Sequence, residues 1–217
     1  MILKRVRVHA GAQGLLTNSY IVYDENKKEA IVIDPGGEAN KIIEILDILE
    51  IEKLKYIFLT HCHADHIGGI HDLKEKKGGK ILVSREDAEG LYNEEISLAY
   101  YIEMQNPELE ADSRVDDGDL IHIGDIEFKV IKTPGHTKGG LSLYCEKERL
   151  VFTGDTMFSG SWGRTDLPTG NFVELMDSIT NKLMILPEET ICYPGHGKTT
   201  MIEDERNIYL ELKEKDF

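Results

Sequence analysis

Residues 60–69 read THCHADHIGG and place three imidazoles and one carboxylate within six positions. The stretch directly follows the apolar run LKYIFL at residues 54–59, which indicates a buried strand. His61 and His63 are two positions apart, so they face the same side of an extended chain. Gly68 and Gly69 then let the backbone turn toward a helix. Imidazoles and a carboxylate at the end of a strand suit zinc, iron or manganese, so the stretch predicts a metal site.

Three more potential metal ligands each follow a strand-like run and a glycine in the second half of the chain. The runs cover residues 126–131, 150–153 and 191–193, and the side chains that follow are His136, Asp155 and His196. A lone histidine is usually satisfied without a metal, so each motif by itself is weak. Four loops of one design argue jointly for a shared site, and against the alternative that residues 60–69 are only a solvated histidine-rich loop.

Length and charge restrict the class of protein. The chain has 217 residues, which suits one domain or a tight two-lobed one with a sizeable core. The formal net charge of −15 argues against nucleic acid and anionic membranes as partners. No run of 18 apolar residues occurs, and charge interrupts the N-terminus at once, so we expect no membrane span and no signal peptide. We therefore expect a soluble, cytoplasmic protein.

The three cysteines predict no disulfide framework. Cys62, Cys145 and Cys192 are odd in number and form no CxxC pair, which fits a reducing compartment. Cys62 lies inside the predicted metal loop, but strand alternation points it away from His61 and His63. We expect Cys62 to be a buried thiol and not a ligand.

The order of the expected elements indicates an α/β fold. Short strand-like runs cover residues 6–9, 18–23, 30–33, 54–59, 80–83, 126–131, 141–144, 150–153 and 191–193. Helices are expected over residues 39–49, from Ser84 toward Tyr92, from Asn171 with Glu174 in the capping position, and from Thr200 with Glu203. The helix that starts at Asn171 is expected to have an apolar face of Phe172, Leu175, Met176, Ile179 and Leu183. A β-rich segment followed by helix, β and helix recurs in both halves, which suggests two packed sheets with helices outside.

The segment 91–104 differs from its surroundings. Tyr92, Ile96, Tyr100 and Met104 recur every four residues. Such a stripe is more often core or a subunit contact than the wall of a substrate pocket. We expect a structural role here, with the pocket wall as the alternative.

Taken together, the motif HxHxDH at residues 61–66 and the dipeptides Gly135-His136, Gly154-Asp155 and Gly195-His196 resemble the metallo-β-lactamase superfamily. Within that superfamily, the chain resembles the small glyoxalase II-like hydrolases, and the runs GDTMF at 154–158 and GRTDLP at 163–168 carry this closer match. The resemblance implies an αββα sandwich of two mixed β-sheets with helices on the outer faces. It also implies one such domain over residues 1–217, with no separate C-terminal glutathione-binding domain.

The resemblance further implies a site with two divalent metal ions, zinc first, with iron or manganese as alternatives. One ion would be held by His61, His63 and His136, and the other by Asp65, His66 and His196. Asp155 would bridge them. Asp65 and Asp155 would then be the catalytic carboxylates.

Two comparisons within the superfamily bear on the substrate. Metallo-β-lactamases usually have a cysteine or serine where Asp155 stands, which argues against antibiotic hydrolysis. Full-length glyoxalase II adds a C-terminal domain with basic residues for glutathione, and this chain ends soon after His196. The thiol carrier is therefore left open.

The leaving group favours a thioester. Two metal ions roughly 3.5–4 Å apart lower the pKa of a shared water toward about 7 and polarise a substrate carbonyl. An amide nitrogen needs a proton to leave, whereas a thiol with a pKa of roughly 8.5 leaves as thiolate. The sequence shows no obvious acid outside the ligand set. We expect a small-molecule thioester as partner, and a monomer or homodimer.

Several residues keep two interpretations. Arg164 either binds the anionic end of the substrate or pairs with Asp166 to hold the loop. Asp34, at the end of the run 30–33, either supports the metal site or caps a turn. Tyr193 is expected in the core of its strand. His9, His71 and His122 lack partner motifs and are interpreted as ordinary histidines.

Two other functions compete with thioester hydrolysis. The first is a persulfide dioxygenase with one iron, which by resemblance would use His61, His136 and Asp155. The residues Leu167-Pro168 depart from the pattern of that group. The second is a metal-binding module without catalysis, which a site with room for water disfavours.

Overall fold

The computed structural model describes residues 1–213, with side chains through residue 209. The chain forms two compact units. The first unit contains residues 1–115 and 122–126, and the second contains residues 116–121 and the chain from residue 127 onward. Two sheets of the fold have six strands each, and both mix parallel with antiparallel pairs.

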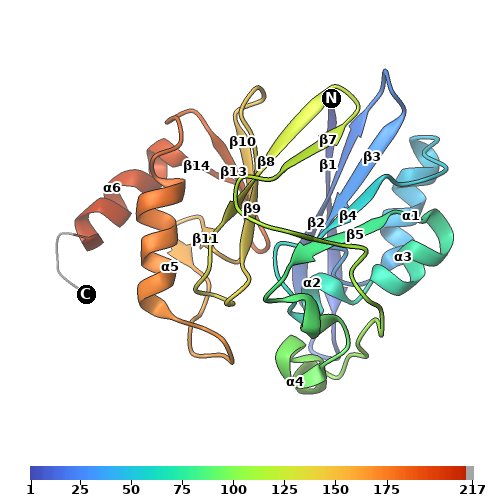
Figure 1. Cartoon of the computed structure of the whole chain (residues 1–217), viewed down its shortest axis with the longest axis horizontal. Helices are drawn as coiled ribbons and strands as arrows, with labels where there is room; N and C mark the ends of the chain where they lie inside the picture. Colours follow the sequence, from blue (N-terminus) through green and yellow to red (C-terminus); the bar gives the residue numbers. More distant parts are fainter. Residues whose placement is uncertain (214–217) are drawn as a thin grey trace. The chain divides into compact units, whose positions relative to one another are not determined.

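The first sheet has the strand order β1-β2-β3-β4-β5-β6 (Figure 1). The strands are β1 (Ile2–Ala10), β2 (Leu15–Asp24), β3 (Glu29–Ile33), β4 (Tyr56–Phe58), β5 (Lys80–Ser84) and β6 (Ser113–Val115). The pairs β1–β2 and β2–β3 are antiparallel, and the pairs from β3 to β6 are parallel. The parallel strands therefore end at one edge of the sheet, where the loop after β4 begins.

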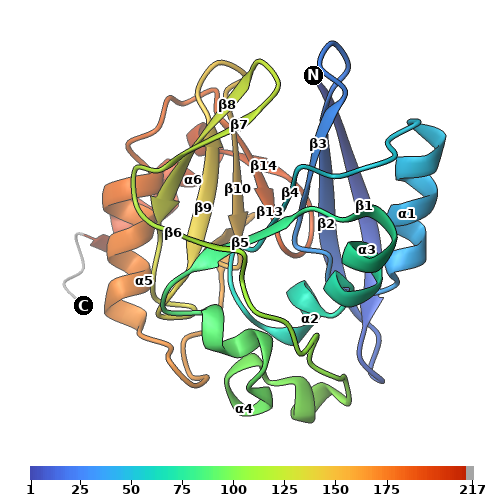
Figure 2. The same ribbon diagram turned by 45° about the vertical axis from the view of Figure 1, so that its right-hand side comes forward.

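Two helices cover a face of this sheet because each carries an apolar stripe. Helix α1 (Ala39–Ile48) buries Ile42, Ile43 and Leu46, and α3 (Ile70–Lys77) buries Ile70 and Leu73. These side chains join one core cluster with residues of the strands. Figure 2 shows α1 and α3 beside each other along the strands of the first sheet. The helix expected over residues 39–49 is confirmed to within one residue.

The second sheet has the order β14-β13-β10-β9-β8-β7. The strands are β7 (Leu120–Ile123), β8 (Ile126–Lys132), β9 (Leu141–Cys145), β10 (Leu150–Gly154), β13 (Ile191–Pro194) and β14 (Thr200–Met201). A separate hairpin is formed by β11 (Met157–Phe158) and β12 (Ser161–Trp162). Strand β10 lies parallel to β13, which puts the residues that follow the two strands at the same end.

Helix α5 (Phe172–Ser178) and the π-helical turn η3 (Ile179–Leu183) form one apolar element of the second unit. Asn171 caps α5, because its side chain accepts the backbone N–H groups of Val173 and Glu174. The buried side chains of Leu175, Met176, Ile179 and Leu183 confirm the expected face. Figure 1 shows α6 (Ile202–Lys213) next to this element, in agreement with their contacts.

Two of the expected helix positions are wrong. Residues 84–92 contain only a four-residue 3₁₀ turn, Ala88–Leu91, and Asp87 donates its backbone N–H to the Ser84 hydroxyl before it. Thr200 does not start the last helix, because it pairs with Cys192 in a strand and α6 begins at Ile202. The end of the chain at Phe217 lies outside the described residues.

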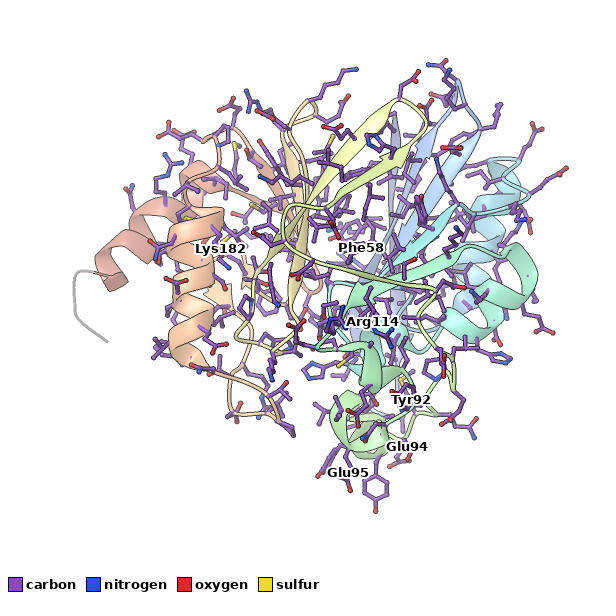
Figure 3. All side chains as sticks on the ribbon, in the orientation of Figure 1. Phe58, Tyr92, Glu94, Glu95, Arg114 and Lys182 are labelled. Carbon is purple, nitrogen blue, oxygen red and sulfur yellow. The ribbon has the colours of Figure 1, made fainter. Side chains whose placement is uncertain are left out.

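The segment 91–104 does not form a buried stripe. It contains α4 (Glu94–Ser97) and the 3₁₀ turn η2 (Ala99–Ile102), and Leu98 between them has a positive φ of 63°. Tyr92, Tyr100 and Tyr101 are 50%, 74% and 67% exposed. Figure 3 shows Tyr92, Glu94 and Glu95 on this segment. The tyrosines are therefore not in the core, because the broken helix does not direct them into one face. A subunit contact, or the wall of a substrate pocket, stays a prediction for this segment.

None of the helices within residues 1–213 has the length and apolar character that spanning a membrane requires.

Candidate metal centre

The first unit positions four of the predicted ligands, which we call the first half-site: His61, His63, Asp65 and His66. The loop leaves β4 at Phe58, and α2 (Ala64–Ile67) carries Asp65 and His66. The rings of His61 and His66 have centroids 4.1 Å apart, and those of His61 and His63 lie edge to face at 4.8 Å. The three histidines are at most 5% exposed. The structure therefore confirms that this stretch gathers its imidazoles in one buried place.

Asp34 holds this loop from the end of β3. Its two carboxylate oxygens accept the backbone N–H of Thr60 at 2.8 Å and the Thr60 hydroxyl at 2.6 Å. The same oxygen that accepts the hydroxyl lies 3.0 Å from Nδ1 of His66. Asp34 is 2% exposed and has a φ of 50°. The contact with His66 agrees with the first of its two interpretations, support of the candidate site, and the residue also makes the turn after β3.

The hydrogen bonds define which nitrogen of the His61 and His66 rings carries the hydrogen. A carboxylate oxygen only accepts, so His66 donates Nδ1–H to Asp34. The Thr60 hydroxyl hydrogen is donated to Asp34, so its oxygen accepts Nδ1–H of His61 at 3.0 Å. In a neutral ring with Nδ1 protonated, Nε2 carries the lone pair. Histidine ligands of metals are oriented in this way by oxygen partners on the other nitrogen.

Asp65 is held by neighbours of the same unit. Its Oδ2 accepts the hydroxyl of Thr17 at 3.2 Å and lies 3.7 Å from Nε2 of His66. The Asp65 side chain is 13% exposed. One carboxylate oxygen and one imidazole nitrogen therefore face each other within the first half-site.

The second unit positions the other three predicted ligands, which we call the second half-site: His136, Asp155 and His196. They follow β8, β10 and β13. Gly195 donates its backbone N–H to the Gly154 carbonyl at 2.8 Å, which fixes the ends of β10 and β13 together. Nε2 of His196 lies 3.3 Å from Oδ2 of Asp155, and Nε2 of His136 lies 3.6 Å from the same oxygen.

His136 is oriented by a backbone carbonyl. Its Nδ1 donates to the carbonyl oxygen of Arg164 at 2.7 Å, because a carbonyl can only accept. His136 is 4% exposed, and Nε2 is the nitrogen that points to Asp155. No sequence pattern signals this contact, since any residue at position 164 has the same carbonyl. Thr60 was also missed, although it stands directly before His61.

Two glycines let backbone segments of the second half-site pack closely against each other. A Cβ atom placed on Gly163 would lie 1.9 Å from the carbonyl oxygen of Asp155 and 2.9 Å from Nδ1 of His136. A Cβ atom on Gly135, which has a φ of 130°, would lie 2.2 Å from the backbone nitrogen of Leu175. Only glycine fits these two positions, so the glycines before and behind the ligands are structural requirements.

The donor set of each half-site fits a metal ion. With bonds of 2.0–2.1 Å, two ligands of a tetrahedral ion are separated by about 3.3 Å. The separations of 3.3 Å and 3.6 Å in the second half-site and 3.7 Å in the first are close to that value. Imidazole nitrogen and carboxylate oxygen also suit zinc, iron and manganese. That the seven residues act together at one centre stays a prediction.

Arg164 forms the ion pair expected as its structural alternative. Nε and Nη2 of Arg164 donate to the two oxygens of Asp166 at 2.8 Å and 2.7 Å. The Arg164 guanidinium lowers the pKa of Asp166 to about 2. Both side chains are more than 60% exposed, so the pair contributes little to stability. Its role in binding a substrate stays a prediction.

Cys62 is a buried thiol, as expected. It is 1% exposed, and burial raises its pKa well above the usual value. Its backbone N–H donates to the buried carboxylate of Asp87 at 3.2 Å. Tyr193 lies on β13 and packs on Phe152 with ring centroids 5.4 Å apart, but it is only half-buried and is not the core residue expected. His9 and His71 are exposed and pair with Glu38 and Asp72.

Comparison with known families supports the sequence-based resemblance. A family model described as the metallo-beta-lactamase superfamily matches residues 12–196. A protein of Haemophilus influenzae named hydroxyacylglutathione hydrolase GloC is 34% identical over 200 residues, which cover 90% of this chain and 93% of that protein.

Three solved structures are similar over nearly the whole chain. The structure of BLEG-1, titled a B3 metallo-beta-lactamase, is 32% identical with a TM-score of 0.86 and coverage of 95% of this chain and 97% of that chain. A di-iron-bound form of TTHA1623 is 30% identical, with a TM-score of 0.79 and coverage of 92% and 96%. The structure of ETHE1 from Myxococcus xanthus is 28% identical, with a TM-score of 0.77 and coverage of 99% and 90%.

Proposed function

Because this chain belongs to the metallo-β-lactamase superfamily and has its fold, we propose that it is a metal-dependent hydrolase of the glyoxalase II type that cleaves small thioesters. One observation carries the proposal. In the second half-site the Nε2 atoms of His136 and His196 both point to Oδ2 of Asp155, within 3.6 Å and 3.3 Å. A carboxylate that faces one imidazole from each of two ligand sets is placed to be shared by two divalent ions.

We propose that the two half-sites together hold two divalent ions. His61, His63 and His136 would hold one ion, Asp65, His66 and His196 the other, and Asp155 both. Zinc is the first candidate, with iron or manganese as alternatives, and the similarity to a di-iron-bound structure supports a site for two ions. When bound, such ions supply Lewis acidity and a water whose pKa is lowered toward about 7.

The residues of the chain contribute orientation and charge. Asp34, Thr60 and the carbonyl of Arg164 fix the rings of His66, His61 and His136, so no ligand has to reorganise during turnover. Asp65 and Asp155 add negative charge that balances the ions. Thr17 holds Asp65 through its hydroxyl.

The hydrogen bonds that orient the candidate ligands favour a thioester over a β-lactam as the substrate. The Thr60 hydroxyl and the Nδ1–H groups of His61, His66 and His136 are used to orient ligands. An amide nitrogen needs a proton in order to leave, whereas a thiolate leaves without one because the thiol pKa is roughly 8.5. One relative is named a hydroxyacylglutathione hydrolase, which supports this choice, and another structure is titled a B3 metallo-beta-lactamase.

The proposed setting follows from composition. With a net charge of −15, the partner we propose is a small-molecule thioester and neither nucleic acid nor membrane. The three cysteines are free and buried, so we propose a reducing compartment, the cytoplasm. We propose a monomer or a homodimer as the oligomeric state.

A side-by-side assay tests the substrate class. The purified protein would be loaded with zinc and given a lactoyl thioester and a cephalosporin at equal concentrations, with kcat/KM measured for both. We expect a higher kcat/KM for the thioester. Faster loss of the cephalosporin would overturn the proposal.

A mononuclear iron enzyme of sulfur oxidation is the second candidate. It would use His61, His136 and Asp155 as its two-histidine, one-carboxylate set. The likeness to the ETHE1 structure supports this candidate. Metal analysis of protein purified without added metal separates the two, because two ions per chain favour hydrolysis and one iron favours oxygen chemistry. Oxygen uptake with a persulfide substrate would confirm the second candidate.

A further inference from the structure

Glu205 is a buried carboxylate that belongs to neither half-site. It lies in the first turn of α6 and is only 2% exposed. Glutamate is rarely buried unless its oxygens are satisfied by donors. Both oxygens accept the backbone N–H of Gly160 at 2.9 Å, and Oε1 also accepts the Thr200 hydroxyl at 2.6 Å. The N-terminal end of a helix also favours a negative side chain.

The two donors of Glu205 belong to the two loops that carry Asp155 and His196. Gly160 is in the turn of the β11–β12 hairpin, which directly follows Asp155 in the chain. Thr200 starts β14, at the end of the loop that begins with His196. One carboxylate thus joins the far ends of both loops. Their near ends are already joined by the bond from Gly195 N–H to the Gly154 carbonyl.

The hairpin in turn contacts the ring of His196. Phe158, on β11, packs edge to face on this ring with centroids 5.9 Å apart. His196 is the more exposed histidine of the second half-site, with 29% of its side chain accessible. Fewer protein atoms surround its ring, so each contact that remains matters more for its orientation. A shift of the hairpin would move Phe158 and release one side of the ring.

Helix α6 holds the hairpin at a second point. The hydroxyl of Tyr209 donates to the carbonyl of Ser161 at 2.6 Å, and its ring lies 6.1 Å from that of Trp162. Tyr209 is one turn beyond Glu205 on the helix. The helix therefore contacts the hairpin through Tyr209 and Glu205. Of these two side chains, Glu205 is the one that also bonds to the His196 loop, through Thr200.

We propose that Glu205 is a positioning residue for Asp155 and His196, which holds their two loops at the separation that a metal ion requires. The catalytic consequence rests on the proposed function, but the effect on metal retention does not. Loss of the carboxylate would let the two loops separate at their far ends and lower the affinity of the second half-site.

The test is the substitution Glu205→Gln, with Glu203→Gln as matched control. The amide keeps the size of the side chain but loses the negative charge and puts an NH₂ donor where the second oxygen accepts the Gly160 N–H, so the charge-assisted bonds to both loops are weakened. Glu203 lies in the same helical turn and is exposed. We expect Glu205→Gln to release bound zinc to a chelator about tenfold faster, since outer contacts of ligands change metal affinity by about 10–100-fold. Glu203→Gln should match the unchanged protein.

A second readout reports coordination directly. With cobalt in place of zinc, the visible absorption spectrum depends on the geometry of the ligands. We expect a changed spectrum for Glu205→Gln and an unchanged one for Glu203→Gln. Thr200→Val, which removes only the bond to the His196 loop, should change the spectrum in the same direction but less, and it serves if Glu205→Gln does not fold.

The outcomes separate positioning from mere support of the fold. A lower Tm for Glu205→Gln with normal zinc release and a normal cobalt spectrum would overturn the proposal, as would normal values in Thr200→Val when Glu205→Gln does not fold. A chain that binds metal but cleaves no thioester would defeat the proposed function alone. The comparison of zinc release between Glu205→Gln and Glu203→Gln would still decide the role of Glu205.

Discussion

Asp34 accepts the Nδ1–H of His66 at 3.0 Å, although the two residues are 32 positions apart in the sequence. The contact joins the end of β3 to the metal loop after β4, which is the adjacent parallel strand. Because the same carboxylate also accepts both donors of Thr60, it fixes the start and the end of the loop together.

Replacement of Asp34 by asparagine should therefore weaken metal binding while the fold persists. Asparagine has a similar size and tolerates the φ of 50°, but it has one oxygen for the three donors. We expect metal affinity to fall about 10–100-fold, measured by competition with a chelator. Asp72→Asn, an exposed site on α3, is the control. Normal affinity in Asp34→Asn would show that the rings keep their orientation without this carboxylate.

Asp155 is expected to be indispensable to the metal site. Its Oδ2 is the point on which His136 and His196 converge, and a carboxylate can also bind a second ion. Asp155→Ala should lose one or both ions and nearly all turnover, as measured by elemental analysis and the thioester assay. Two tightly held ions and a near-normal rate in this variant would contradict the bridging role.

Gly163→Ala should disrupt the second half-site without touching a ligand. The new methyl group would overlap the carbonyl of Asp155, with only 1.9 Å available. Overpacking of this kind costs about 1–3 kcal/mol of stability, which denaturant unfolding would measure. We also expect weaker metal binding, because Nδ1 of His136 is 2.9 Å from the same point. Ser161→Ala, exposed on the same hairpin, should behave as the unchanged protein, and a normal Gly163→Ala would refute the close approach.

Arg164 and Asp166 offer a test of substrate binding. If the guanidinium binds the anionic end of the thioester, Arg164→Ala should raise KM and lower kcat/KM roughly ten- to a hundredfold with metal content unchanged. Asp166→Asn should then lower KM, because it frees the guanidinium from its ion pair. Steady-state kinetics of both variants give the answer. If neither variant changes KM, the pair only holds its loop.

The pH dependence of this pair follows from the lowered pKa of Asp166. A carboxyl group whose folded-state pKa is depressed keeps its ion pair above its unfolded pKa and loses it as the pH falls through the folded value, here about 2. The pair is therefore intact throughout the neutral range. We expect no change in KM from this pair between about pH 6 and 8.

The sequence by itself determined the candidate ligands and the elements that carry them. The spacing of His61, His63, Asp65 and His66 after an apolar run depends on strand alternation alone, a local property. The glycines before His136, Asp155 and His196 are also a local signal, because each follows the end of a strand-like run. Apolar periodicity likewise located α1 and α5, because each buries one face.

Only the tertiary structure decided how those ligands are held. Asp34, the carbonyl of Arg164 and Glu205 act over separations that no local pattern encodes. The structure also rules out a core position for Tyr92 and Tyr100, because a period of four predicts a face only while the helix continues, and the chain breaks at Leu98. Local periodicity fixes which side chains project, whereas the pairing of β3 with β4 and of β10 with β13 decides which of them meet.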